Sequence, residues 1–254
     1  MMVNIELAGV CLGLVASLGV SMGLTASTIR GKGTLAQKKR WLPELVTMEK
    51  VGAWAITEPD SGSDALGGMK TTVRRDGDDY ILNGQKTFIT NGPYADTIVV
   101  FAKLDDGSGT PMRDRKVLSF VLDKGGMPGL VQGKPFKKMG MMSSPTGELF
   151  FDNVRVGKDR LLGETEDTGE DSRGSEGAKA GFTAERVASQ RCRWASSTRR
   201  SACRSITPRH ASCGARRSPS SSSSSSSSPR WRSPGSTCRT CSSARSNAAR
   251  RVSR

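Results

Sequence analysis

Hydrophobic and polar residues follow a helical period near the start of the chain. Residues 7–24 form an almost uninterrupted apolar run of about the length that spans a membrane. No basic residue precedes this run, and its larger side chains recur at helical spacing with small residues between them, namely Leu14, Leu18 and Met22. We therefore expect a buried helix of an all-helical domain rather than a membrane span or a signal peptide, with further helices before Met1.

A glycine-containing stretch separates this run from a second helical pattern. Residues 31–36 look like a dinucleotide-binding loop, with Glu49 at a suitable distance downstream. That motif requires a strand before it and a second parallel strand after the helix, and the sequence supplies neither. We interpret the stretch as a turn before a short amphipathic helix over residues 35–46, which Pro43 should break. The basic cluster at residues 38–40 fits a solvated face.

Residues 51–156 change to the short alternating pattern of β-strands. Asp76-Gly77 and Asn83-Gly84 are typical of tight turns between such strands. Strands are expected over residues 51–56, 69–74, 80–83, 85–90, 98–103, 117–122 and 148–156. A set of short strands with polar turns and no helical period predicts a small antiparallel barrel or sandwich.

The positive charge of the chain is confined to its last part. The formal net charge is +15, but 15 of the 39 Lys and Arg residues follow Arg186, where there is no Asp or Glu. The residues up to Arg186 therefore balance 24 basic against 24 acidic groups, and the basic pI is not a property of the predicted domains. Nine consecutive serines at residues 220–228 and the loss of any period predict a disordered tail over residues 189–254.

Two interpretations of this tail are open. Its Arg, Ser, Pro, Cys, Ala and Gly content is what GC-rich DNA gives in a shifted reading frame, which we take as the main hypothesis. The alternative is a β-barrel module with a basic disordered tail that binds RNA or another polyanion. Cys238 and Cys241 could form a zinc site with His210 and Cys213, but the spacings fit no ordinary zinc finger, so we expect no metal.

Only Cys11 precedes Arg186, and a single cysteine in an apolar run suits a reducing compartment. We therefore expect a cytoplasmic protein. The main interpretation includes no nucleic-acid partner and no membrane partner.

The stretch from residue 55 to 67 carries the clearest chemistry. A strand-like run ends at Thr57-Glu58-Pro59, and the small residues that follow offer backbone N–H groups and hydroxyls to phosphate or carbonyl oxygens. The pattern of a small and an aliphatic residue, then Thr-Glu-Pro-x-x-Gly-Ser-Asp-x-x-Gly, resembles the first signature of the acyl-CoA dehydrogenases, which are flavoenzymes that oxidise acyl-CoA thioesters. Residues 37–43 and the aromatic-Ile-Thr triplet at residues 88–90 extend the resemblance, which covers about residues 5–188.

The resemblance implies an α+β multidomain fold in four parts. Residues 1–50 would end an N-terminal all-α domain, and residues 51–160 would form the β-barrel middle domain that binds FAD and acyl-CoA. Residues 161–188 would be a loop and the first turn of a C-terminal helical domain, and residues 189–254 would be the tail without homology.

The resemblance also implies roles for individual residues. FAD would be held by the barrel, and the residues carried over for it are Trp54, Ile56, Thr57, Gly62, Ser63, Phe88, Ile89 and Thr90. Ser63 and Arg186 would approach the acyl-CoA substrate, and Glu185 is the candidate for the catalytic base that removes the α-proton.

Electron-transfer flavoprotein would be the electron acceptor, and the family forms homotetramers. Because residues after Ala188 do not resemble the family, we expect weak FAD binding, little or no activity and no stable tetramer. A nitroalkane- or acyl-CoA-oxidising relative on the same scaffold is a further alternative, since the barrel alone does not separate these reactions.

Overall fold

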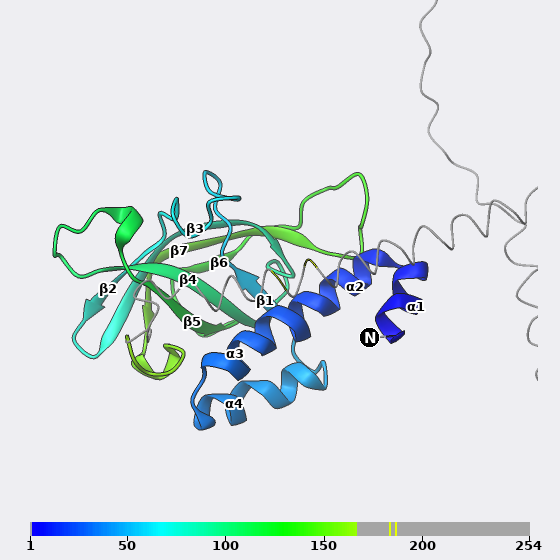
Figure 1. Ribbon diagram of the computed structural model, residues 1–254, viewed down its shortest axis with the longest axis horizontal. Coiled ribbons are helices and arrows are strands. Elements are labelled where there is room, and N and C mark those ends of the chain that lie inside the picture. Colours follow the sequence, from blue (N-terminus) through cyan, green and yellow to red (C-terminus); the bar gives the residue numbers. More distant parts are fainter. Residues whose placement is uncertain (1, 167–182, 184–185, 187–254) are drawn as a thin grey trace, which may run out of the picture. The chain divides into compact units, whose positions relative to one another are not determined.

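In the computed structural model, residues 2–166, 183 and 186 are described, and within them a group of helices precedes a seven-stranded sheet (Figure 1). The helices are α1 (Met2–Val10), α2 (Leu12–Leu18), a π-helix (Gly19–Thr25), α3 (Ala26–Lys32) and α4 (Leu35–Val46). The strands are β1 (Gly52–Ala55), β2 (Thr72–Asp76), β3 (Asp79–Thr90), β4 (Thr97–Asp105), β5 (Val117–Asp123), β6 (Leu130–Gln132) and β7 (Thr146–Val156). Short 3₁₀ helices lie at Met112–Asp114 and Lys158–Arg160.

The helical run from Leu12 to Lys32 packs on β1 through small and polar residues. The backbone N–H of Gly52 donates to Ser21 Oγ at 2.9 Å, and a Cβ on Gly52 would lie 2.9 Å from the Thr25 side chain. Because the helix approaches the strand so closely, small and polar residues face it, and the expectation that Leu14, Leu18 and Met22 form the buried face is wrong. Leu14 and Met22 are 41% and 40% exposed, whereas the buried face carries Val15, Ser21, Thr25, Ala26 and Ile29.

Leu12–Lys32 is long and apolar enough to cross a membrane by length and composition, and it is the one such helix among the described residues. A core helix of a soluble protein passes the same test. The hydrogen bond from Gly52 to Ser21 and the hydrogen bond from Trp54 Nε1 to Thr28 Oγ1 at 3.1 Å join this helix to the sheet.

The glycine-containing stretch is an interhelical turn, as the sequence predicts. α3 ends at Lys32, and Thr34 caps α4 by accepting from the Gln37 backbone N–H, while Thr34 N–H donates to Gln37 Oε1. The expected break at Pro43 is wrong, because α4 continues through it and Thr47 N–H donates to the Pro43 carbonyl at 3.0 Å. Pro43 removes one donor, and packing of Trp41 and Leu45 holds the helix together across it.

The sheet is mixed and curls into a half-barrel, so the prediction of a purely antiparallel barrel is wrong in detail (Figure 1). β1 and β2 both pair in parallel with β4, whereas the β2–β3, β3–β7, β4–β5 and β6–β7 pairs are antiparallel. Parallel strands need a long connection between them. The segment from β1 to β2 supplies one, and it contains the Thr-Glu-Pro stretch.

β3 is a single long strand where two strands were expected. The Asp76-Gly77 turn forms as predicted, with Asp76 paired to Asp79 and Gly77 at φ +64°. Asn83-Gly84, however, is not a corner, because β3 continues through a register shift between Leu82 and Gly84. Gly84 has φ +143°, and a Cβ there would lie 2.8 Å from Thr71 Cα, so the glycine allows two backbones to meet.

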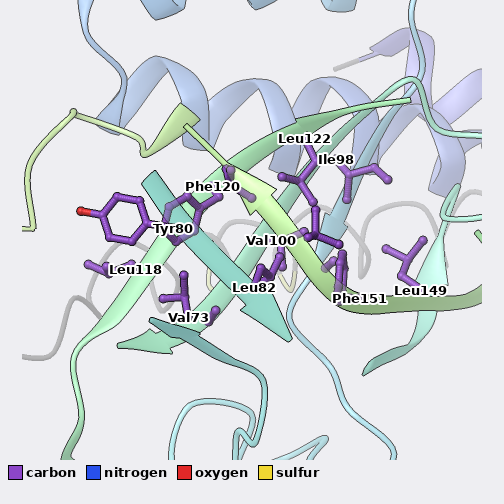
Figure 2. Packing of buried hydrophobic residues seen from close by; sticks show 14 of the residues in the cluster. Val73, Tyr80, Leu82, Ile98, Val100, Leu118, Phe120, Leu122, Leu149 and Phe151 are labelled. Atoms are coloured by element: carbon purple, nitrogen blue, oxygen red, sulfur yellow. The ribbon is translucent and has the colours of Figure 1, made fainter. Parts of the chain in front are cut away.

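Both faces of the central strand β4 are buried. Ile98, Val100 and Ala102 point into the cluster enclosed by the curled sheet, and Val99 and Phe101 belong to the cluster between sheet and helices. Figure 2 shows the enclosed cluster, in which side chains from several strands meet: Val73, Tyr80, Leu82, Ile98, Val100, Leu118, Phe120, Leu122, Leu149 and Phe151. Each such side chain contributes about 1.5–3 kcal/mol when fully buried, so this cluster is the main source of the domain's stability.

A single side-chain amide joins the helices to the segment after β7. Gln37 is 3% exposed, and its Nε2 donates to the carbonyls of Asp159 at 2.9 Å and Leu161 at 2.7 Å. Its Oε1 accepts from Thr34 N–H at 3.0 Å and from Gly163 N–H at 3.1 Å. All hydrogen-bonding positions of the amide are used, which fixes its orientation.

Candidate functional site

The Thr57-Glu58-Pro59 stretch forms a tight corner directly after β1. The backbones of Glu58 and Ser61 exchange two hydrogen bonds of 3.0 and 3.1 Å, and Ser61 Oγ donates to the Asp64 carbonyl at 2.6 Å. Gly62 and Ser63 are exposed at the tip, and no atom lies within 4 Å of the position that a Gly62 Cβ would occupy. The turn therefore presents backbone and a small hydroxyl to open space, as a site for phosphate oxygens requires.

A buried ion pair holds this corner to strand β3. Lys86 Nζ lies 2.8 Å from Glu58 Oε1, and the two side chains are 0% and 4% exposed. Lys86 Nζ also donates to the Ile56 carbonyl at 3.2 Å. The Glu58 carboxylate accepts from the backbone N–H groups of Lys70 at 2.6 Å and Thr71 at 3.0 Å. One ion pair thus joins the end of β1, the approach to β2 and the middle of β3.

Burial and pairing act in opposite directions on these two charges. Burial lowers the pKa of Lys86 to about 8, and the charge of Glu58 limits the shift. For Glu58, burial alone would favour the neutral acid, but the charge of Lys86 and three donated hydrogen bonds outweigh burial, so the pKa is lowered. Both groups are therefore ionised at neutral pH.

The ion pair brings together the two segments that the sequence resemblance singles out. Thr87 N–H donates to the Thr57 carbonyl at 2.9 Å, directly after Lys86 in the chain. Beyond it, β3 shifts register between Lys86 and Ile89, and Phe88 lies within this bulge at φ +56°. The Phe88 ring is 67% exposed and packs edge-on to Phe136, with ring centroids 5.6 Å apart. A left-handed aromatic residue that exposes its ring is unusual, and it marks a surface that an apolar ring system would cover.

The remaining predicted cofactor residues divide into accessible and buried ones. Thr57 and Thr90 are half-buried, so each residue is partly accessible. Trp54, Ile56 and Ile89 are buried in the hydrophobic clusters, and Trp54 Nε1 is bonded to Thr28 Oγ1 on α3. These three side chains are buried, whereas Thr57, Ser63, Phe88 and Thr90 are at least partly exposed.

Sequence reasoning missed the charged residues that shape the corner. Lys103 is also fully buried, and its Nζ donates to the carbonyls of Gly67 at 2.8 Å and Met112 at 2.5 Å. Burial is the main cause of its lowered pKa. The sequence did indicate that Lys103 is buried, because Lys103 lies on the same face of an apolar strand as Val99 and Phe101. Glu58 and Lys86 gave no such signal, since they pair with each other and lie 28 residues apart in the chain.

Asn91 is a second missed residue, and it ties the end of β3 to the helices. Its side chain is 0% exposed and its backbone has φ +65°. Nδ2 donates to the carbonyls of Gly52 at 2.9 Å and Ser17 at 3.0 Å, and Ser17 Oγ donates to Oδ1. The Asn91 N–H donates to the Pro145 carbonyl at 2.7 Å, so four segments meet at this residue.

The described residues include neither the candidate base nor the tail. Glu185 lies outside the described residues, as do the segment 189–254 and the Cys238/Cys241 pair. Arg186 is described as an exposed helical residue. Within the described part, no group of three or more His, Cys, Asp or Glu residues could hold a metal ion.

The residues at the corner fit a flavin dinucleotide. A flavin combines a flat apolar ring system with hydrogen-bonding edges and a pyrophosphate. The exposed Phe88 ring would face the ring system, the Thr57 and Thr90 hydroxyls would reach its polar edges, and the backbone at Gly62 and Ser63 would approach the phosphates.

Two models of protein domains match the chain. The model of the acyl-CoA dehydrogenase N-terminal domain matches residues 1–49, and that of the acyl-CoA dehydrogenase middle domain matches residues 53–154. A 3-(aryl)acrylate reductase from Clostridium sporogenes is 46% identical over 132 residues, which are 52% of this chain and 33% of that protein. The short-chain-specific acyl-CoA dehydrogenase of Megasphaera elsdenii is 40% identical over 159 residues, which are 63% of this chain and 40% of that protein.

Solved structures give the same result. A glutaryl-coenzyme A dehydrogenase in complex with glutaryl-CoA superposes with a TM-score of 0.66 at 33% identity, over 75% of this chain and 45% of that chain. The glutaryl-CoA dehydrogenase of Mycobacterium smegmatis in complex with FADH2 superposes with a TM-score of 0.61 at 32% identity, over 74% and 46%. The chain spans less than half of the length of these relatives. Sequence and fold agree, and the chain belongs to the acyl-CoA dehydrogenase family.

Proposed function

We propose that this chain provides the flavin-binding and acyl-CoA-binding corner of an FAD-dependent acyl-CoA dehydrogenase. The observation that carries the proposal is the contact between the two signature segments, through the Thr87–Thr57 hydrogen bond and the Lys86–Glu58 ion pair. The reaction is the α,β-dehydrogenation of an acyl-CoA thioester, with electrons passed on to electron-transfer flavoprotein. The protein is proposed to be cytoplasmic and to act on a soluble thioester.

The chemistry divides between the cofactor and the chain's own residues. FAD, when bound, supplies the acceptor for the hydride that leaves the β-carbon as the α-proton goes to a base. Phe88 would cover one part of the flavin, Thr57 and Thr90 would fix its polar edges, and Ser63 would lie beside the flavin phosphates and the acyl-CoA. Glu185 is the proposed carboxylate base, and Arg186 is the proposed contact to the CoA phosphates.

The proposal includes the four-part division at residues 1–50, 51–160, 161–188 and 189–254. Because residues after Ala188 do not resemble the family, we expect the chain to bind FAD weakly, to show little activity and not to form the family's tetramer. The comparisons lend no support to RNA binding as an alternative.

A titration of the full 254-residue chain with FAD, followed by quenching of flavin fluorescence, tests the site. Gly62→Trp places a large ring in open space at the corner and leaves the packing intact. It should weaken FAD binding at least about tenfold, which corresponds to roughly 1.4 kcal/mol. Gly126→Trp is the matched control, because Gly126 also has no neighbour within 4 Å, and it should leave FAD affinity unchanged. Equal affinity of both variants would exclude the corner as the site.

A second candidate is the reduction of an acrylate double bond, which is the same exchange of electrons run in the opposite direction. The observation that favours it is the 46% identity to a 3-(aryl)acrylate reductase. Two assays with added FAD separate the candidates. Reduction of a dye by butyryl-CoA supports the dehydrogenase, and reoxidation of a reduced dye by an arylacrylate or its CoA thioester supports the reductase.

A further inference from the structure

We propose that Lys86 and Glu58 are positioning residues that hold Thr57 at a fixed place relative to residues 88–90. The inference rests on the proposed function, since it concerns the same flavin site. Neither side chain is accessible, so neither contacts the cofactor or the substrate directly. Their effect must pass through the backbone segments that they join.

The cost of this ion pair argues for a geometric role. Taking two charges out of water is expensive, and replacing a buried pair by apolar residues is often neutral or stabilising. The half-barrel already encloses an extensive apolar cluster, so it does not need this pair for stability. A pair that accepts two backbone N–H groups and donates to one backbone carbonyl specifies the path of the chain more than it adds to stability.

The two charged residues stand at the points where the site residues leave regular structure. Glu58 directly follows Thr57, and Lys86 is the last residue of β3 before the shift in pairing with β7. Lys86 pairs with Leu149, and pairing resumes only at Ile89 with Gly147, so Phe88 lies in the unpaired interval. Anchoring Lys86 to Ile56 and Glu58 therefore fixes where the bulge begins and where the Phe88 ring emerges.

The test compares the wild-type chain with the double variant Glu58→Gln/Lys86→Met. The double variant leaves no unpaired buried charge, whereas either single change would, and a single variant could fail to fold. Amide hydrogen exchange is measured at Thr87, Lys70 and Thr71, whose N–H groups donate to the corner, relative to Gly133, which donates to Glu148. FAD affinity is measured on the same samples.

We expect the exchange ratio of Thr87, Lys70 and Thr71 to Gly133 to rise at least about tenfold in the double variant. Glu58→Gln leaves one acceptor oxygen where the carboxylate has two, and without the ion pair the Thr57 carbonyl that accepts from Thr87 is no longer held in place. FAD binding should weaken by about tenfold or more, because Thr57 and residues 88–90 are no longer held in the arrangement that the flavin requires. Val154→Ala is the control, because it removes buried apolar volume from β7 without touching the corner. It should leave both the exchange ratio and the FAD affinity unchanged.

Two results would overturn the inference. One is an unchanged exchange ratio in the double variant, and the other is an equal rise in the Val154→Ala control. The proposed function fails separately, if the wild-type chain does not bind FAD while the exchange ratio still rises. In that case the ion pair positions the corner as inferred, and the flavin assignment is wrong.

Discussion

Asn91 Nδ2 donates to the carbonyl oxygen of Gly52 at 2.9 Å, although 39 residues separate the two in the chain. The same amide reaches Ser17 on α2, so the first strand, the end of β3 and the helical layer share one hydrogen-bonding centre. Asn91 achieves this with a backbone at φ +65°, a conformation that asparagine tolerates better than most residues.

Two substitutions of Asn91 separate the contribution of its buried amide to stability from that of its left-handed backbone. Asn91→Gly keeps the left-handed backbone and loses the buried amide contacts, and we expect a loss of about 1–3 kcal/mol in the free energy of unfolding. Asn91→Ala adds backbone strain and should cost about 1 kcal/mol more. Urea unfolding of both variants measures the difference, and equal stability of the two would contradict the backbone contribution.

The contact between Gly52 and the long helix predicts a strict size limit. Gly52→Ala places a methyl group 2.9 Å from the Thr25 side chain and 3.1 Å from Leu45, and it should destabilise the chain by about 1–3 kcal/mol. Gly126→Ala is the matched control, since nothing lies within 4 Å of its Cβ position, and its effect should stay within about 0.5 kcal/mol. Thermal unfolding of the two variants is the measurement.

The exposed ring of Phe88 should matter for FAD binding and little for stability. Phe88→Gly removes the ring and relieves the left-handed strain, so we expect the unfolding free energy to change by less than about 1 kcal/mol. FAD affinity should fall by about two- to tenfold, the range of one lost aromatic contact. Tyr94→Ala, at an exposed aromatic residue without a proposed role, is the control and should not alter FAD affinity. Unchanged FAD binding in Phe88→Gly would remove the ring from the site.

The buried ion pair predicts how stability depends on pH. The lowered pKa of Glu58 adds stability above its unfolded value of about 4.5, and this is lost as pH falls through the lower folded pKa. Lys86 has a folded pKa of about 8 and an ordinary value of 10.5, so the unfolded chain holds the proton more tightly between these values. The Lys86 contribution to stability therefore rises with pH from about 8 to 10.5.

Unfolding free energies measured across these two pH ranges check the direction in which stability changes with pH. The double variant Glu58→Gln/Lys86→Met is the reference, because it lacks both titrating groups. Wild type should lose stability relative to this reference in acid and gain it in alkali. A wild-type curve parallel to the reference over both ranges would show that the pair does not titrate as described.

Local patterns predicted the elements more reliably than their partners. The β-branched run at residues 98–103 and the similar run at 117–122 located β4 and β5, and the amphipathic pattern over residues 35–46 located α4. The parallel pairing of β1 with β4 was not predictable in this way, because it joins residues 45 positions apart.

The candidate site shows the same division. The Thr-Glu-Pro and aromatic-Ile-Thr stretches were visible as motifs, yet the charges that join them were not. Lys86 and Glu58 read as surface residues in their local context, and only their mutual proximity makes burial of either tolerable. β3 was divided at Asn83-Gly84 for a related reason, since a glycine that admits the Thr71 backbone looks in sequence like a glycine that turns a chain.

Gln37 has a consequence for cooperativity. Because its amide bonds to Thr34 at the start of α4 and to Asp159, Leu161 and Gly163 after β7, neither region can detach without exposing unsatisfied groups in the other. The start of α4 and the residues after β7 should therefore unfold as one cooperative unit, with hydrogen-exchange protection factors that rise and fall together.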